Sequence, residues 1–295
     1  MTADIEVSII IPSFNSLDKL PSALRAIENL NFPTNNFELI IVDDGSTDGT
    51  QDYIASYIEN TRISVTYIYQ ENAGPAAARN TGIRRALGEF LLFLDSDSYV
   101  DSDILVHFLG HFPQPGLGGV GGDVIPDYLN IITEFLDAVG TWRPGEDSSG
   151  RVTYLVTANA FFLKQAVVEA GYFDEGFRIP GGEEPELCFR MRKIGYHFLF
   201  EKRSKVIHTH QNNLKALIGM SLNHGKGKAI MLTKWPNSGS ILKFWRVALG
   251  NNSFKWIRAI GLRKRLITTT ISFWVLDYIR QWAIYCGFRS EFQQK

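Results

Sequence analysis

The sequence contains little cysteine. Its two cysteines, Cys188 and Cys286, stand far apart in the chain. Neither belongs to a closely spaced pair of the kind that binds zinc, and two distant thiols make no disulfide framework. Because frequent disulfides are typical of oxidising compartments, this scarcity favours a protein of a reducing compartment, and we expect a cytoplasmic location.

The sequence also lacks a long uninterrupted hydrophobic run. Its most apolar long segment, residues 266–288, contains Asp277, Arg280 and Gln281. A membrane-spanning helix needs about 20 predominantly apolar residues and rarely carries charges near its middle. We therefore favour an amphipathic helix that lies at the surface of a membrane. A helix packed on the protein itself and a spanning helix are the alternatives.

Acidic residues are rare in one part of the chain. Residues 201–265 contain 14 Lys and Arg against one acid, whereas residues 1–200 contain 13 against 28 acids. This asymmetry predicts an acidic region, 1–210, that can hold metal, and a basic, aromatic, helical tail, 211–295. The tail could contact anionic lipid at the cytoplasmic face of a membrane, or neutralise the acidic region across an internal interface. The acidic first part argues against nucleic acid as a partner.

Apolar runs of strand length alternate with amphipathic stretches of helix length in the first 100 residues. The expected strands cover 7–12, 37–42, 63–69 and 90–94, and the expected helices cover about 17–30, 48–58 and 73–87. This alternation predicts βαβ units, and hence an α/β fold in which a mainly parallel twisted sheet carries helices on both faces. Farther along the chain, residues 196–200 and 205–209 are expected to form a pair of strands.

Polar clusters follow three of the expected strands, at residues 12–15, 43–48 and 95–97. Open α/β sheets bind their ligands at the carboxyl ends of strands. Asp95 and Asp97 directly follow a buried strand, so that their side chains can converge on one cation. Such oxygen ligands, completed by phosphates, suit Mg²⁺ or Mn²⁺. A simple polar turn is the alternative, but the similar end at Asp43 and Asp44 favours a nucleotide site.

A second acidic cluster follows two glycines, where a helix is expected to begin. It contains Glu183, Glu184 and Glu186. Acids at a helix N-terminus are stabilised by the helix dipole, so capping is one interpretation. A general base held on a rigid helix is the other. Farther on, His208 and His210 would point the same way on a strand, where they could be structural or supply a metal ligand.

Five segments, taken in order, resemble the motifs of family 2 glycosyltransferases with the GT-A fold. They are VSIIIPSFN at 7–15, IIVDDGSTDGT at 40–50, ENAGPAAARNTG at 71–82, FLDSD at 93–97 and GGEEPEL at 181–187. The resemblance covers about residues 5–210, and the set in this order is highly specific although each motif alone is not. It implies a GT-A catalytic domain with a nucleotide-binding half, about 1–100, and an acceptor half, about 101–210.

The resemblance implies an enzyme that transfers a sugar with inversion and uses Mn²⁺ or Mg²⁺. The donor would be a nucleotide-diphosphate sugar, with UDP as the favoured nucleotide. The acceptor would be a hydroxyl of a saccharide or of a lipid-linked carrier, in the synthesis of cell-surface glycans or lipid-linked saccharides. A non-catalytic protein of the same fold that binds nucleotide sugars is the alternative.

The resemblance also implies a set of nucleotide-binding residues. They are Pro12, Phe14, Asn15, Asp44, Arg79 and Asp95. Phe14 and the backbone of Pro12 would line the pocket for the base, and Asp44 would accept a hydrogen bond from it. Arg79 would contact the base or the diphosphate, and Asp95 would hold the ribose.

The same resemblance implies that Asp97 ligates the metal, that His208 is a second ligand, and that Glu184 is the catalytic base. The base motif of the family is usually Glu-Asp with a further Asp two residues on, whereas this chain has EEPE at residues 183–186. This departure leaves the choice among neighbouring acids open. The alternatives are Glu183 and Glu186 for the base and His210 for the metal.

Overall fold

The chain groups into two compact units. The computed structural model describes residues 5–209, 213–236 and 267–292. One unit, here called the sheet unit, comprises Met1–Ile125, Arg143–Arg178 and Glu184–His208. The other, here called the helical unit, comprises Pro126–Trp142, Ile179–Glu183 and Thr209–Lys295.

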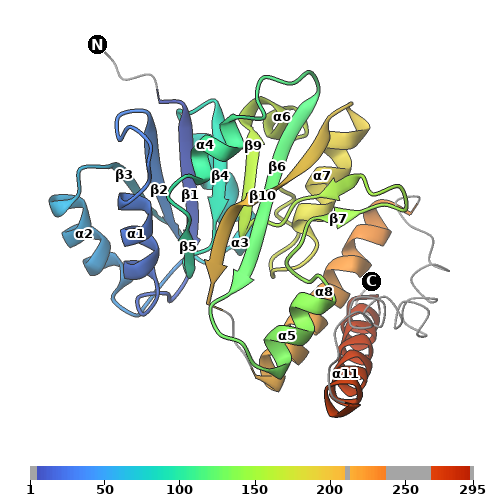
Figure 1. Ribbon diagram of the computed structural model, residues 1–295. Helices are drawn as coiled ribbons and strands as arrows, with labels where there is room; N and C mark the ends of the chain where they lie inside the picture. Colours follow the sequence, from blue (N-terminus) through green and yellow to red (C-terminus); the bar gives the residue numbers. More distant parts are fainter. Residues whose placement is uncertain (1–4, 210–212, 237–266, 293–295) are drawn as a thin grey trace. The chain divides into compact units, whose positions relative to one another are not determined.

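The first four strands of the sheet unit run parallel to one another, in the order β3-β2-β1-β4 (Figure 1). They are β1 (Val7–Ser13), β2 (Phe37–Asp43), β3 (Ser64–Tyr69) and β4 (Phe90–Leu94). Strands β1, β2 and β4 are almost entirely buried, which agrees with their continuous apolar sequences. This half of the sheet confirms the expected βαβ units, because a helix follows each of β1, β2 and β3.

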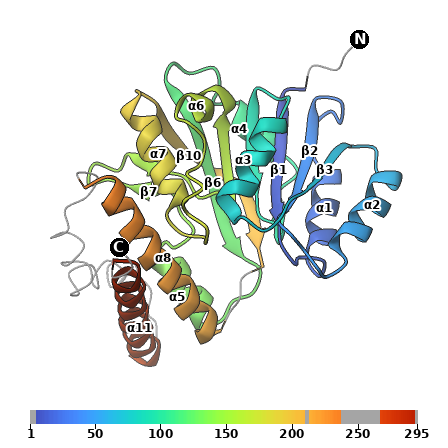
Figure 2. The same ribbon diagram turned by 180° about the vertical axis from the view of Figure 1, so that it is seen from behind.

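Helices cover both faces of this sheet, as Figures 1 and 2 show from opposite sides. Ile9 and Ile11 of β1 belong to one hydrophobic core and Ile10 belongs to the other, because successive side chains of a strand point to opposite faces. The first core is covered by α1 (Leu20–Glu28), α2 (Thr50–Asn60) and α4 (Ile104–Leu109). The second core is covered by α3 (Pro75–Arg85), α6 (Lys164–Glu169) and α7 (Glu183–Lys193).

The other four strands make the sheet mixed rather than parallel throughout. The complete order is β3-β2-β1-β4-β9-β6-β10-β5. The additional strands are β5 (Ser98–Val100), β6 (Leu117–Pro126), β9 (Asn159–Leu163) and β10 (His197–His208). Strand β9 is antiparallel to both β4 and β6, and β10 is antiparallel to β5. A small separate sheet pairs β7 (Gly145–Glu146) with β8 (Val152–Tyr154).

The expected strand pair at residues 196–200 and 205–209 is wrong. A single strand, β10, covers His197–His208 without a turn. The charged middle of this segment suggested a break, but Glu201 and Arg203 in it form an ion pair. Glu201 accepts hydrogen bonds from the backbone N and the guanidinium of Arg203, and its carboxylate lies 2.9 Å from Nε2 of His111. The strand can therefore continue to His208.

The helical unit contains α5 (Ile131–Ala138), α8 (Leu214–Lys234) and α11 (Ile267–Phe292), which confirms the expected C-terminal helical region. Helices α8 and α11 pack closely because both carry glycine at the contact: a Cβ on Gly225 would overlap the carbonyl oxygen of Ile284. On α11, Asp277 pairs with Arg280 at 2.9 Å. Among the described residues, none of the helices combines the length and the apolar character that crossing a bilayer requires.

Candidate functional site

Two carboxylates and an imidazole meet at one end of the sheet. Asp95 and Asp97 lie in the turn that connects β4 to β5, and β5 pairs with β10 so that Ser98 stands opposite His208. Nε2 of His208 lies 3.1 Å from Oδ2 of Asp95 and 3.1 Å from Oδ1 of Asp97. One ligand atom from each residue can be chosen so that all three lie within 4.8 Å of one another. The structure thus brings two aspartates of one motif together with a histidine that lies far from them in the sequence.

Two cations border this cluster. Nζ of Lys19 lies 3.2 Å from Oδ2 of Asp97, and Nη2 of Arg79 lies 3.8 Å from Oδ1 of Asp95. Lys19 was not predicted as a site residue, because a single lysine before a helix carries no recognisable pattern. The positive groups offset the negative charge of the two carboxylates, and they also make this end of the sheet suitable for a diphosphate.

Burial and charge compete in setting the pKa values of the cluster. Burial raises the pKa of Asp97 above its ordinary value, although His208 and Lys19 act in the opposite direction. Burial alone would lower the pKa of His208, but the hydrogen bond that His208 donates to Asp95 and the negative charges of both aspartates outweigh it, so this pKa is raised. Both shifts reflect ionisable groups that lie close together in a partly buried place.

The cluster has the chemistry of a divalent-cation site. Carboxylate oxygens are the preferred ligands of Mg²⁺ and Mn²⁺, and imidazole nitrogen is an acceptable ligand for transition metals. The side chains of Asp97 and His208 are 17% and 13% exposed, so that they are partly buried yet open to a ligand. The residues present therefore fit a metal ion. His210, the alternative ligand, lies outside the described residues.

The loops after β1 and β2 are joined by hydrogen bonds at the same end of the sheet. The backbone N of Asn15 donates to Oγ of Ser46 at 2.8 Å, and Oδ1 of Asn15 accepts from the backbone N of Thr47 at 2.9 Å. Asn15 has a φ of 49°, a conformation that asparagine tolerates better than most residues. Beside it the Phe14 ring is 52% exposed, which leaves a flat apolar face open to a base, while Pro12 is half-buried in β1.

Asp44 holds the loop that leads into α3. It is 4% exposed, and Oδ1 accepts hydrogen bonds from Nε2 of Gln70 and from the backbone N of Ala73. Oδ2 accepts from the backbone N of Gly74 at 2.9 Å. Sequence reasoning missed this structural role, since the donors lie 26 residues or more farther along the chain. A carboxylate oxygen can accept about two hydrogen bonds, so Oδ2 has the capacity for one more.

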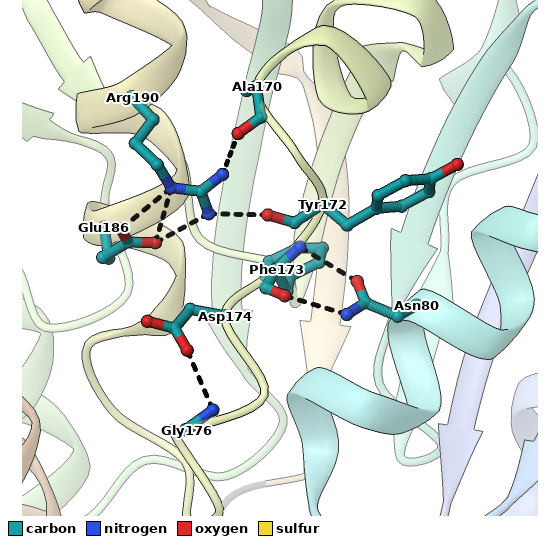
Figure 3. Close-up of polar contacts among 8 residues, drawn as sticks. All are labelled: Asn80, Ala170, Tyr172, Phe173, Asp174, Gly176, Glu186 and Arg190. Atoms are coloured by element: carbon teal, nitrogen blue, oxygen red, sulfur yellow. Dashed lines mark hydrogen bonds and ion pairs between the residues drawn. The ribbon is translucent and has the colours of Figure 1, made fainter.

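Arg79 is buried on α3 and faces the acidic cluster. It is 5% exposed, and its guanidinium lies over the ring of Phe173 with 5.6 Å between the carbon and the ring centroid. Phe173 is held in turn by Asn80, which donates to its carbonyl and accepts from its backbone N (Figure 3). The next residue on α3 therefore fixes the ring against which Arg79 packs.

The three glutamates near the start of α7 have different surroundings. Glu186 is 2% exposed and forms a two-pronged ion pair with Arg190, which also donates to the carbonyls of Ala170 and Tyr172 (Figure 3). Glu183 is 1% exposed and accepts a hydrogen bond from the backbone N of Gly181.

Glu184, between them, is only half-buried and accepts a hydrogen bond from Oγ1 of Thr157 at 2.9 Å. Glu184 is thus the least buried of the three carboxylates, and Thr157 is a hydrogen-bond partner that the sequence did not indicate.

Two family models match this chain. One, described as glycosyl transferase family 2, matches residues 8–154, and the other, described as glycosyl transferase family group 2, matches residues 90–286. The second match alone covers more than half of the chain. The chain belongs to the family 2 glycosyltransferases. The resemblance read from the five motifs is thereby confirmed.

Curated relatives of this glycosyltransferase agree with the assignment. Glycosyltransferase AglE of Haloferax volcanii is 31% identical over 196 residues, which are 66% of this chain and 64% of AglE. The pre-mycofactocin glycosyltransferase of Mycobacterium tuberculosis is 26% identical over 256 residues, which are 81% of this chain and 52% of that protein. The chain thus spans less than two-thirds of the length of these relatives.

Solved structures show the same fold. The mannosyltransferase PcManGT from Pyrobaculum calidifontis, solved with GDP-Man and Mn²⁺, superposes with a TM-score of 0.72 at 16% identity, covering 98% of this chain and 88% of that one. TarS of S. aureus, residues 1–349 with UDP-GlcNAc, superposes with a TM-score of 0.57 at 15% identity, covering 97% and 92%. The GT-A fold is therefore confirmed.

Proposed function

We propose that this glycosyltransferase is metal-dependent and inverting, and that it transfers a sugar to a hydroxyl of a saccharide or a lipid-linked carrier. The observation that supports this proposal best is the cluster of Asp95, Asp97 and His208 at the carboxyl ends of β4 and β10. Such a position is where open α/β sheets bind nucleotides. The synthesis of cell-surface glycans or of lipid-linked saccharides is the process that we propose for it.

Asp97 and His208 would hold Mn²⁺ or Mg²⁺. When bound there, the cation would stabilise the negative charge on the departing nucleoside diphosphate. Arg79 and Lys19 border the cluster at 3.8 and 3.2 Å from its carboxylates, so both can add positive charge where the diphosphate would lie. Asp95 would accept hydrogen bonds from the ribose hydroxyls.

The loops after β1 and β2 would recognise the base. The exposed Phe14 ring offers a stacking surface beside Pro12 and Asn15, and Asp44 would accept a hydrogen bond from an imide N–H. Uracil carries such a group, and the corresponding N–H of guanine would serve as well. UDP is the nucleotide that we propose, and the TarS structure with UDP-GlcNAc supports it. The PcManGT structure with GDP-Man makes GDP the comparison to test.

Glu184 would act as the general base. Its carboxylate would remove the proton from the acceptor hydroxyl while that oxygen forms a bond to the anomeric carbon and the bond to the diphosphate breaks. A single displacement of this kind inverts the anomeric configuration. The hydrogen bond from Thr157 at 2.9 Å would hold the carboxylate in a fixed direction.

We also propose that the C-terminal region contacts an anionic membrane peripherally, from the cytoplasmic side. Trp274, Tyr278 and Trp282 follow one another at intervals of four residues on α11 and are 60%, 67% and 59% exposed. Side chains four apart lie on one face of a helix, and Trp and Tyr are the residues that favour the membrane interface. The basic residues of 201–265 would add attraction to anionic lipid.

The proposed reaction can be tested by the release of nucleoside diphosphate. The protein is incubated with UDP-GlcNAc or GDP-mannose, with Mn²⁺ or with excess EDTA, and UDP or GDP is measured; water serves as the acceptor. We expect release from one donor only, and only with the cation. Release that is equally fast in EDTA would rule out metal dependence, and no release from either donor would contradict the proposed use of these nucleotides.

A further inference from the structure

The loop before Glu184 is pressed against a helix of the C-terminal region. Within the helical unit, α8 approaches Gly181 and Gly182 so closely that a Cβ on Gly227 would overlap the carbonyl oxygen of Gly181 and lie 3.2 Å from Cα of Gly182. From the other side, a Cβ on Gly181 would lie 2.8 Å from Cδ2 of His224. Backbone thus meets backbone, and neither side leaves room for a methyl group.

The loop itself has little conformational freedom. Gly181 and Gly182 have φ values of 122° and 121°, a region that is essentially reserved for glycine. The buried carboxylate of Glu183 accepts a hydrogen bond from the backbone N of Gly181 at 2.7 Å, which closes the loop on itself. Glu184 is the next residue in the chain, in the first turn of α7. A shift of Gly181 and Gly182 would therefore be passed directly to Glu184.

The opposite side of α8 is held by α11. A Cβ on Gly225 would overlap the carbonyl oxygen of Ile284, and a Cβ on Gly287 would overlap that of Leu222. Helix α8 thus contacts α11 on one side and the loop on the other. A displacement of α8 away from either one would change its contact with the other. A packed contact of this kind transmits small displacements instead of absorbing them.

We infer that α8, through Gly227 and His224, positions the loop that leads directly into Glu184, the proposed catalytic base. Gly227 is then a positioning residue for sugar transfer. The inference rests on the proposed role of Glu184. Glu184 touches the acceptor, whereas Gly227 acts on the rate only through the loop. Displacement of a catalytic group by about 1 Å can cost roughly 100-fold in rate.

The chain offers a matched control on the same helix. Gly219 also lies on α8, but a Cβ placed there meets nothing within 4 Å. Gly227→Ala and Gly219→Ala therefore introduce the same methyl group into the same helix, and only the first presses on the loop. His224→Ala provides a variant that loosens the support without overlap, in case Gly227→Ala does not fold.

The first measurement is hydrogen–deuterium exchange of the peptide 179–187 in the full chain. We expect faster exchange in Gly227→Ala and in His224→Ala, and wild-type exchange in Gly219→Ala. Exchange in the peptide that contains Asp95 and Asp97 should not change. If Gly227→Ala leaves the exchange of 179–187 unchanged, the proposal is overturned whatever the rate of catalysis.

The second measurement is the rate of UDP or GDP release from UDP-GlcNAc or GDP-mannose with Mn²⁺. We expect Gly227→Ala to lower kcat by about 100-fold, to leave the Kd of the donor unchanged, and to cause no further loss in a Glu184→Gln background. If Gly227→Ala lowers kcat by about 100-fold in the Glu184→Gln background as well, Gly227 does not act through Glu184. If Glu184→Gln itself retains the wild-type kcat, the assignment of Glu184 as the base is wrong. The hydrogen–deuterium exchange of the peptide 179–187 then tests by itself whether α8 positions the loop.

Discussion

At the scale of single residues, three neighbouring glutamates have different surroundings. Glu186 is joined to Arg190 and Glu183 to the backbone of Gly181, and both are almost fully buried. Glu184 is half-buried and is oriented by Thr157. Removing one partner of a buried ion pair is costly, whereas a partly open and oriented carboxylate can exchange a proton with a ligand.

We predict that Glu184→Gln lowers turnover by about 10²- to 10⁴-fold, because the amide cannot remove a proton. Donor affinity should stay close to that of the wild type, since the base acts on the acceptor. Calorimetry of donor binding beside the rate of diphosphate release checks both parts. Should Glu183→Gln be the inactive variant instead, the base has been assigned one residue too late.

We predict that Glu186→Gln behaves in the opposite way. Losing one charge of a buried ion pair should lower the free energy of unfolding by about 1–3 kcal/mol, while turnover below the melting temperature should remain near that of the wild type. Urea unfolding followed by circular dichroism measures the first quantity. The prediction is wrong if stability is unchanged and activity is lost.

Asp97→Asn should remove metal-dependent binding of the nucleotide, because a neutral amide is a weaker ligand for a hard cation than a carboxylate. Asp101→Asn is a suitable control, as Asp101 is an exposed aspartate beyond the same turn. The Kd of UDP with Mn²⁺ is the quantity to compare. An unchanged Kd in Asp97→Asn would exclude Asp97 as a ligand.

At the scale of secondary structure, one pairing builds the acidic cluster. Strand β10 runs antiparallel to β5 and places His208 opposite Ser98, one residue after Asp97. Its charged middle, which includes Glu201 and Arg203, made it resemble two strands, because the local sequence pattern does not show that these two residues form an ion pair within one strand. The strands β1, β2 and β4 were predictable because their continuous apolar sequences reflect burial on both faces.

Helix α11 carries a prediction of its own. Replacing Trp274, Tyr278 and Trp282 by alanine should weaken binding to vesicles that contain anionic lipid, by at least about tenfold, because their exposed rings are the parts suited to the interface. Tyr128→Ala removes an exposed aromatic ring outside this helix and is the control. Cosedimentation with anionic and neutral vesicles measures the effect. Equal binding to both, or none, would favour an internal role for the basic region.

At the scale of the whole molecule, the proposed site depends on long-range structure. Its side chains come from β1, from the loops that follow β1, β2 and β4, and from α3, β10 and α7, and His208 stands 113 residues from Asp95. The two aspartates could be predicted from the sequence because they directly follow a strand. The residue pattern left His208 open between a structural residue and a metal ligand, and the family resemblance favoured the ligand. Lys19 and Thr157 were missed because they reach the site through the fold and not through a motif.

The central claim is that the Asp95, Asp97 and His208 cluster holds a nucleotide together with a divalent cation. Isothermal titration calorimetry of UDP, with GDP for comparison, in the presence and absence of Mn²⁺ tests it most directly. We predict binding of one nucleotide that requires Mn²⁺ in the wild type and is lost in Asp97→Asn. Binding that is equally tight without a cation, or that persists in this variant, would contradict the claim.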